Sequence, residues 1–200
     1  MYPESLLNLI EQFQKLPTIG RKSAERLAMH IIEEKIDDVK DFSDALIEVK
    51  EKIKKCKICG NISEDEICEI CKNEYRDKSK ILVVENVRSL YAIEKSDIYN
   101  GYYHVIGGLI SPSDDVSASK LNIDSLVERI ENGNVKELIL AIPSTINGEM
   151  TSLFLKNLFK NYDLNITKLA TGIPVGSDLE YFDQLTLKTA LNDRRDVEDI

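Results

Sequence analysis

Four cysteines are the residues of this chain whose type and spacing point most directly to chemistry. All of them lie within 16 residues, in the pattern C-x2-C-x8-C-x2-C formed by Cys56, Cys59, Cys68 and Cys71. Within each pair, two intervening residues form the short turn that brings two sulfurs to one ion. The pattern predicts one structural Zn²⁺ per chain, held by four thiolates.

Other uses of the cysteines remain open. A thioredoxin-like redox pair would sit where a strand passes into a helix, two disulfides would need an oxidising compartment, and an iron–sulfur cluster would take the same ligands. The segment MYPESLLNLIEQFQ lacks the basic start of a secretory signal, and no apolar run approaches the roughly 20 residues of a membrane span. We therefore expect reduced cysteines, a cytoplasmic protein and no membrane contact.

The cysteine segment is too short to build a hydrophobic core of its own. Metal binding must then supply its folding energy, and loss of the metal should loosen the segments on both sides. The segment is expected to act as a metal-stabilised structural link between two larger parts of the chain.

The residues before the cysteines follow a helical pattern. Apolar residues recur at helical spacing in residues 4–14 and again in residues 21–34. Between them, Pro17 should end the first helix and Gly20 should permit the turn into the second. This is the pattern of a helix–hairpin–helix. A third helix, capped by Asp41 or Ser43, is expected to lead to the cysteines.

A helix–hairpin–helix can bind a phosphate. The unpaired N–H groups in the first turn of its second helix would face the anion, with Arg21, Lys22 and Ser23 beside them. Arg26 belongs to the same basic run and is a further candidate DNA contact. Such a contact reads the DNA backbone and not the base sequence. The alternative is an ordinary helical corner without a ligand.

The distribution of charge along the chain also favours the N-terminal region as the place where DNA would bind. The net charge of −9 divides into −2 for residues 1–80 and −7 for residues 81–200. A polyanion would therefore bind the N-terminal part. A second basic run, between Lys50 and Lys57, is either part of that surface or a solvated helix face.

Beyond residue 80, short apolar strands alternate with helices. Strands are expected at residues 81–84, 102–106, 137–142 and 165–170, and helices at 87–94, 124–132 and 150–161. This alternation predicts a mainly parallel sheet covered on both faces, with functional groups at the carboxyl ends of its strands. Glu85 and Glu149 lie at such ends. Residues 175–200, with a helix over 184–191, should dock on the sheet or bind a neighbouring subunit.

Five segments, in this order, resemble the RecR family of bacterial recombination mediators. They are LPTIGRKSAERLA, the four-cysteine segment, ILVVEN, YYHVIGGLISP and GIPVGSDLEYFDQLTL. The resemblance implies a multi-part α/β chain. Its parts would be a helix–hairpin–helix region (1–54), a four-cysteine zinc finger (55–79), a Toprim domain (80–175) and a C-terminal arm (176–200).

The resemblance also implies a function and an assembly. The chain would form a ring-like homotetramer that acts as a DNA clamp in recombinational DNA repair. With RecO and RecF as partners, it would help to load RecA onto gapped DNA coated by single-strand-binding protein. The basic residues of the family's hairpin fall on Lys22 and Arg26, and its Toprim acidic positions on Glu85 and Glu149. Thr18 stands where the family hairpin has glycine, which should alter the turn.

Catalysis is not expected. Toprim enzymes hold a divalent cation with a glutamate after the first strand and an Asp-x-Asp pair after a later one. Here Glu85 is present, but the later strand ends Ala141-Ile142-Pro143-Ser144-Thr145. No Walker A loop is found, and neither His30 nor His104 has an evident partner for acid–base work. Glu85 and Glu149 are then expected to bind Mg²⁺ only weakly, or to contact a partner protein. The alternatives are a Toprim-type metal-dependent nuclease or primase, and a protein-only adaptor.

Overall fold

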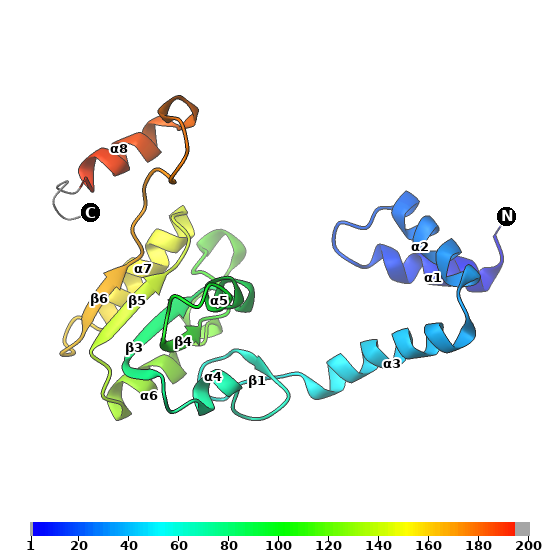
Figure 1. The fold of residues 1–200 in the computed structure, drawn as a ribbon, viewed down its shortest axis with the longest axis horizontal. Coiled ribbons are helices and arrows are strands. Elements are labelled where there is room, and N and C mark those ends of the chain that lie inside the picture. Colours follow the sequence, from blue (N-terminus) through cyan, green and yellow to red (C-terminus); the bar gives the residue numbers. More distant parts are fainter. Residues whose placement is uncertain (1, 195–200) are drawn as a thin grey trace. The chain divides into compact units, whose positions relative to one another are not determined.

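The computed structural model describes residues 2–194, which fold as two compact units with the boundary in the chain between Ile53 and Lys54 (Figure 1). The first unit contains α1 (Glu4–Gln14), α2 (Arg21–Glu33) and α3 (Ile36–Lys52). Helices α1 and α2 pack through Leu6 and Ile10 on one side and Ala24 and Ala28 on the other. The two alanines are small enough to let the helices approach closely. The predicted helical hairpin is confirmed.

The predicted start of the third helix is wrong. Helix α3 begins at Ile36, after Lys35, so Asp41 and Ser43 lie inside the helix and cap nothing. Asp37 and Asp38 occupy its first turn, where carboxylates interact favourably with the positive end of the helix dipole. The acidic first turn therefore marks the true beginning of the helix.

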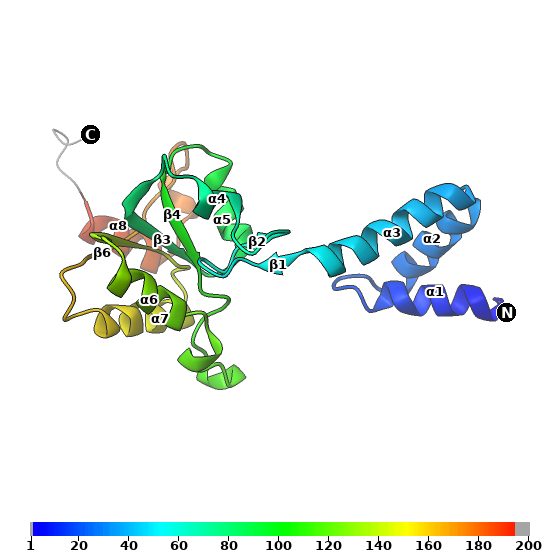
Figure 2. The same ribbon diagram turned by 90° about the horizontal axis from the view of Figure 1, so that it is seen from below.

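The second unit is built on a four-stranded parallel sheet in the order β4-β3-β5-β6. Its strands are β3 (Asp77–Val84), β4 (Gly101–Val105), β5 (Glu137–Ala141) and β6 (Asn165–Lys168). Its main helices are α5 (Val87–Glu94), α6 (Asp124–Asn132) and α7 (Ile146–Leu158). Figure 2 shows α6 and α7 on one side of the sheet and α5 on the other. The predicted parallel sheet with two covered faces is confirmed.

Alternating side chains of β3 supply both cores. Ile81 and Val83 belong to the cluster that includes Leu126 of α6 and Leu155 of α7. Leu82 and Val84 belong to the cluster that includes Leu90 of α5. A fully buried central strand is expected to be apolar at every position, because both of its faces are covered.

Several boundaries differ from the predicted ones. Strand β3 begins at Asp77 and not at Ile81. Helix α7 begins at Ile146 and not at residue 150, because the Thr145 hydroxyl accepts a hydrogen bond from the Gly148 N–H at 3.2 Å. A side-chain cap of this kind satisfies a first-turn amide that has no partner within the helix.

The remaining elements are short. They are β1 (Lys54–Lys55), β2 (Ile62–Ser63), α4 (Glu69–Lys72), three 3₁₀ turns (Pro112–Asp114, Ala118–Lys120 and Leu179–Tyr181) and α8 (Gln184–Asn192). The C-terminal helix predicted over residues 184–191 is confirmed, and the last six residues of the predicted arm lie outside the described residues. Over residues 2–194, no helix combines the length and the apolar character needed to cross a bilayer.

Candidate metal centre and nucleic-acid interface

The four cysteine sulfurs come together in the second unit. The Sγ atoms of Cys56, Cys59, Cys68 and Cys71 all lie within 4.8 Å of one another, and those of Cys59 and Cys68 are 3.6 Å apart. A tetrahedral zinc with bonds of about 2.3 Å places its sulfurs about 3.8 Å apart, whereas a disulfide joins sulfurs at about 2.05 Å. The geometry therefore fits one metal ion and not two disulfides.

Two tight turns present the sulfurs. The Gly60 N–H donates to the Cys56 carbonyl oxygen at 3.0 Å, and the Lys72 N–H donates to that of Cys68 at 3.0 Å. The Cys68 N–H donates to the Cys56 sulfur at 3.3 Å. Hydrogen bonds from amides to a ligand sulfur orient it and stabilise its negative charge. The cysteine spacing thus produces a preformed set of ligands.

The cysteine segment is attached to the edge strand β4. The Val105 N–H donates to the Cys59 carbonyl oxygen at 2.7 Å. Gly60 has a φ of +74°, and a Cβ atom there would lie 2.8 Å from the Val105 carbonyl oxygen. Only glycine fits both the left-handed backbone and this close approach. The segment therefore also covers a strand edge that would otherwise be open.

The effects of the four thiols on one another's pKa values are also those expected of a metal site. The hydrogen bond with Cys59 lowers the pKa of Cys68, and the same hydrogen bond raises the pKa of Cys59 to about 12. Hydrogen bonds with Cys59 and Cys68 raise the pKa of Cys71 as well. Four thiolates this close repel one another unless a divalent cation lies between them. The donor set therefore suits Zn²⁺, which these sulfurs would hold as a structural ion.

The turn between α1 and α2 contains a strained residue. Thr18 has a φ of +67°, in the left-handed region that a β-branched side chain rarely adopts. The turn is closed by a hydrogen bond from the Ile19 N–H to the Leu16 carbonyl oxygen at 3.2 Å. Ile19 packs against the core between the two helices. The hairpin thus holds its shape at a cost in backbone strain.

We expect Thr18→Gly to stabilise the first unit by about 1 kcal/mol, because relief of the left-handed strain exceeds the added chain entropy of glycine. Ser23→Gly is the matched control. It places glycine in the first turn of α2, where the backbone is helical, and should destabilise the unit. Urea unfolding followed by circular dichroism measures both. A loss of stability in Thr18→Gly would show that the turn is not strained.

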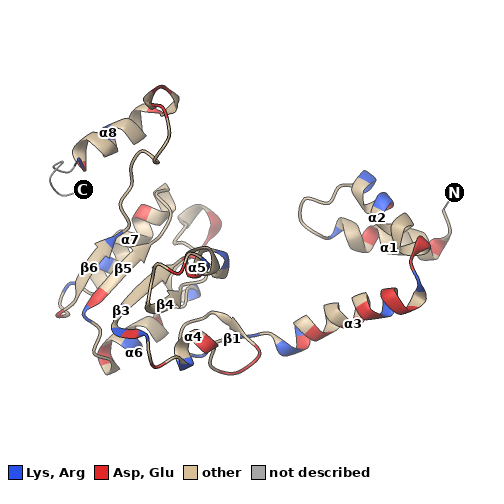
Figure 3. Cartoon of the chain, in the orientation of Figure 1, with Lys and Arg blue, Asp and Glu red and all other residues tan. Residues whose placement is uncertain are grey.

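The three basic residues of the hairpin lie exposed on the first two turns of α2. Figure 3 shows basic residues gathered at this end of the helix. Arg21 is paired with Glu25, with 3.1 Å between Nε and Oε1. Neither Lys22 nor Arg26 forms an ion pair with any residue in the range 2–194, and both line a shallow cleft of about 550 Å³. Two of the three cations are therefore free for an anion.

The acidic residues at the carboxyl ends of the strands do not form a comparable cluster. Glu85 follows β3 and is half-buried, while Glu149 lies exposed in the first turn of α7 and forms an ion pair with Lys168 of β6. Among the described residues, the four cysteines are the only group of three or more metal-binding side chains close enough to share an ion. The positive group next to the Glu149 carboxylate is therefore the Lys168 ammonium.

Comparison with known proteins supports the resemblance. Four family models match successive parts of the chain: RecR helix-hairpin-helix over residues 6–50, the RecR four-cysteine zinc finger domain over 53–73, Toprim domain over 79–170 and RecR C-terminal over 172–195. A recombination protein RecR from Lactobacillus acidophilus is 47% identical over 96% of this chain and 98% of its own length. One from Staphylococcus aureus strain Newman is 44% identical over 98% and 99%. The chain belongs to the RecR family.

The two histidines of this RecR family member have different surroundings. His104 is buried in β4, its Nε2 lies 2.7 Å from the Asn122 carbonyl oxygen, and its Nδ1 lies 3.3 Å from an Arg129 nitrogen. Burial lowers the pKa of His104 to about 4, so the ring is neutral at physiological pH. His30 is exposed and pairs with Glu34 at 3.2 Å. The structure thus places His104 in the core and His30 on the surface.

Three residues that the sequence did not single out support the RecR metal segment and the Toprim sheet. The Arg129 guanidinium donates to the Tyr103 carbonyl oxygen at 2.7 Å, and the Asn122 side-chain amide donates to that of Val105 at 3.1 Å. These two hydrogen bonds satisfy carbonyl groups on the outer edge of β4, beside the cysteines. The third residue, Lys168, forms an ion pair with Glu149. Each contact joins residues at least 17 positions apart, so no local pattern could have indicated it.

Proposed function

We propose that this chain is a non-enzymatic, DNA-binding mediator of recombinational DNA repair. The observation that carries the proposal is the pair of unpaired cations, Lys22 and Arg26, beside the N-terminus of α2. No side chain caps that helix end within the described part of the chain, so its first-turn amides face outward with the two cations. The RecR helix-hairpin-helix model covers these residues.

The zinc finger has a structural part in this proposal. One Zn²⁺ per chain, held by the four cysteines, would stabilise the segment that covers β4. Because this site needs reduced thiols, we place the protein in the cytoplasm.

The proposed DNA clamp requires several copies of the chain. One acidic chain with a small basic hairpin would bind DNA weakly, whereas several hairpins around one duplex would act together. Helix α3 offers a surface for assembly. Its apolar residues Val39, Phe42, Leu46 and Val49, followed by Ile53 just beyond the helix, recur at alternating intervals of three and four, as in a coiled-coil seam. Phe42, Leu46 and Val49 are 47%, 60% and 62% exposed. A second copy would cover them, which supports the ring-like homotetramer.

RecO and RecF are the proposed partners, with the loading of RecA onto gapped DNA as the outcome. The acidic surface around Glu85 and Glu149 would contact a basic partner and would not act in catalysis. Carboxylates repel phosphate, and the lysine beside Glu149 takes the place that a bridging cation would need.

A RecA-loading assay tests the proposal. Gapped DNA coated by single-strand-binding protein is incubated with RecA and RecO, and filament growth is measured with and without this chain. We expect the chain to accelerate loading. We expect Glu85→Lys to lose that acceleration and to bind RecO more weakly, while binding DNA alone at least as well as the wild type does. Undiminished RecO affinity in Glu85→Lys would remove Glu85 from the partner surface. No acceleration by the wild type would contradict the mediator function.

The second candidate is a Toprim-type nuclease or primase. The observations in its favour are the Toprim match over residues 79–170 and the place of Glu85 at the carboxyl end of β3. This candidate predicts Mg²⁺- or Mn²⁺-dependent cleavage or synthesis that is lost in Glu85→Gln. The mediator predicts no product from either protein. Denaturing gels of labelled gapped DNA, run from the same incubations, distinguish the two candidates.

A further inference from the structure

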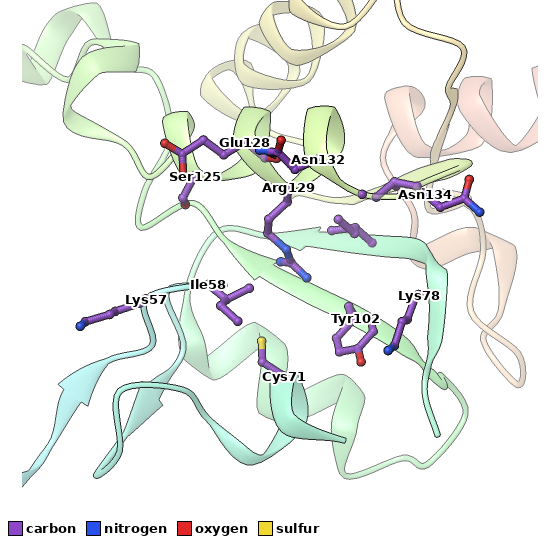
Figure 4. Close-up of a pocket in the computed structure, with 13 residues that line it drawn as sticks. Lys57, Ile58, Cys71, Lys78, Tyr102, Ser125, Glu128, Arg129, Asn132 and Asn134 are labelled. Carbon is purple, nitrogen blue, oxygen red and sulfur yellow. Dashed lines mark hydrogen bonds between the residues drawn. The ribbon is translucent and has the colours of Figure 1, made fainter. Parts of the chain in front are cut away.

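Two separate clefts of the second unit reach the cysteine cluster, and they differ in charge. The first has a volume of about 510 Å³ and is lined by Cys71 together with residues of β3, β4 and α6 (Figure 4). The second has a volume of about 460 Å³ and is lined by Cys68 together with residues of β2, α4 and α5. A small molecule in solution thus has two routes to the sulfurs.

The first cleft is basic. Lys57, Lys78 and Arg129 line it against a single carboxylate, that of Glu128. Lys57 is paired with Glu66 at 2.7 Å, but the Lys78 ammonium forms no ion pair over residues 2–194. Figure 4 shows the Cys71 sulfur and the Arg129 guanidinium turned toward the middle of the cleft. An anion entering here would meet the uncompensated charge of Lys78 in the cleft that Cys71 also lines.

The second cleft is acidic. Its lining includes the carboxylates of Glu64, Asp65, Glu69 and Glu94, and it includes no lysine or arginine among the residues that the structure describes. Cys68, the cysteine on this side, is only 3% exposed. Lys72 pairs with Asp65 and Glu69, and Arg76 pairs with Glu94, so two cations outside the lining balance part of this negative charge. The remaining charge does not attract anions, and the burial of Cys68 hinders neutral reagents as well.

Exposure to solvent also distinguishes Cys71 from the other three cysteines. Cys56, Cys59 and Cys68 are 3%, 0% and 3% exposed, whereas Cys71 is only partly buried. A bound zinc would keep all four sulfurs deprotonated, so their reactivity would differ by access and by nearby positive charge. Cys71 is the cysteine that is both partly exposed and part of the basic cleft.

We propose that Cys71 is an oxidation site, reached through the basic cleft by small oxidants and most readily by anionic ones. This inference goes beyond the proposed mediator function and does not depend on it, because its readout is the modification of a sulfur and not DNA binding.

The chemistry needs only a peroxide or a disulfide as oxidant. With hydrogen peroxide, the Cys71 thiolate attacks one oxygen, an S–O bond forms, the O–O bond breaks, and hydroxide leaves. The thiolate of a neighbouring cysteine then attacks the oxidised sulfur, so that an S–S bond forms and a second hydroxide leaves. Two thiolates lose two electrons, and the peroxide becomes two hydroxides, which two protons convert to water. The other three sulfurs are near enough for this second step.

Oxidation would act on the metal centre as a whole. A disulfide removes two of the four thiolate ligands, and two remaining thiolates bind zinc far more weakly than four. Because Cys59 holds β4 through its backbone carbonyl, the effect would reach the edge of the sheet. Reduction by a dithiol would restore the ligands.

The site of first reaction is tested on the zinc-loaded full chain. The chain is treated with less than one equivalent of 5,5′-dithiobis(2-nitrobenzoate), a dianionic disulfide, and the modified cysteine is identified by peptide mass spectrometry. In this reaction the Cys71 thiolate attacks one reagent sulfur, a mixed disulfide forms, and nitrothiobenzoate leaves. We expect most modified peptides to contain Cys71, either as the mixed disulfide or as the disulfide that forms when a neighbouring cysteine displaces the second nitrothiobenzoate. Preferential labelling of Cys68, or equal labelling of all four, would overturn the proposal.

The part played by the cleft is tested by charge reversal. Lys78→Glu should slow the reaction with the dianionic reagent by about threefold to tenfold at low salt, because one wall of the route becomes repulsive. The reaction with neutral 4,4′-dithiodipyridine should change by less than about twofold. Lys188→Glu, which makes the same charge change on α8 outside both clefts, should alter neither rate. Zinc content and circular dichroism confirm that the variants are folded. Equal slowing by Lys188→Glu, or an unchanged ratio of the two rates in Lys78→Glu, would contradict entry through the basic cleft.

Discussion

Cys59→Ser is expected to leave the chain without zinc and to lower the unfolding temperature of the second unit by about 10 °C or more. Cys59 is fully buried, and the hydrophobic cluster around it consists of the cysteines and three isoleucines. Such a cluster is too small to fold without metal. A structural zinc supplies about 10–16 kcal/mol of binding free energy in small domains, and even a third of that would produce this shift in a unit of this size.

Elemental analysis and differential scanning calorimetry measure the two effects. Protein purified without added metal should contain about one zinc per chain in the wild type and essentially none in Cys59→Ser. Ser63→Ala, a small change in the same segment outside the ligand set, serves as the control and should keep both the metal and the unfolding temperature. A Cys59→Ser protein that lacks zinc but unfolds at the wild-type temperature would show that the metal does not stabilise the fold.

The double variant Lys22→Ala/Arg26→Ala is expected to bind duplex DNA roughly tenfold to hundredfold more weakly at near-physiological salt. Both side chains are exposed and form no ion pair over residues 2–194, so their removal breaks no salt bridge there. Each lost phosphate contact weakens binding, and the loss is multiplied when several copies of the hairpin hold one duplex. Fluorescence anisotropy with a labelled gapped duplex gives the affinities.

Lys35→Ala/Lys40→Ala is the matched control for the hairpin. It removes two positive charges from the same unit, at exposed positions of the chain outside the hairpin. If the contact lies at the hairpin, the control should retain most of the affinity. Equal losses in the two double variants would mean that net charge, and not the hairpin, governs DNA binding.

The features that followed from the sequence are those that depend on neighbouring residues. The spacing of Cys56 and Cys59 is that of a two-residue turn, and Pro17 and Gly20 fix the break between two helices. The apolar run from Ile81 to Val84 indicates a buried strand because both of its faces are covered. Local sterics and periodicity determine all three features, so one sequence is enough to predict them.

The features that the sequence did not show depend on residues far apart in the chain. Nothing near Glu149 indicates that Lys168 of another strand pairs with it. Likewise, the basic cleft beside Cys71 exists only because α6 packs next to the cysteine segment and brings Arg129 there. The start of α3 was missed for a different reason. Asp41 and Ser43 are good cap residues, but the helix had already begun at Ile36.

The measurement that most directly tests the proposed function is the salt dependence of DNA binding by the zinc-loaded wild-type chain. The logarithm of the association constant is plotted against the logarithm of salt concentration for two duplexes of unrelated sequence. We predict a linear decrease with the same slope for both duplexes, about −0.9 for each phosphate contacted, because the contact is made to the DNA backbone. An affinity that does not change with salt, or that depends strongly on sequence, would contradict the account.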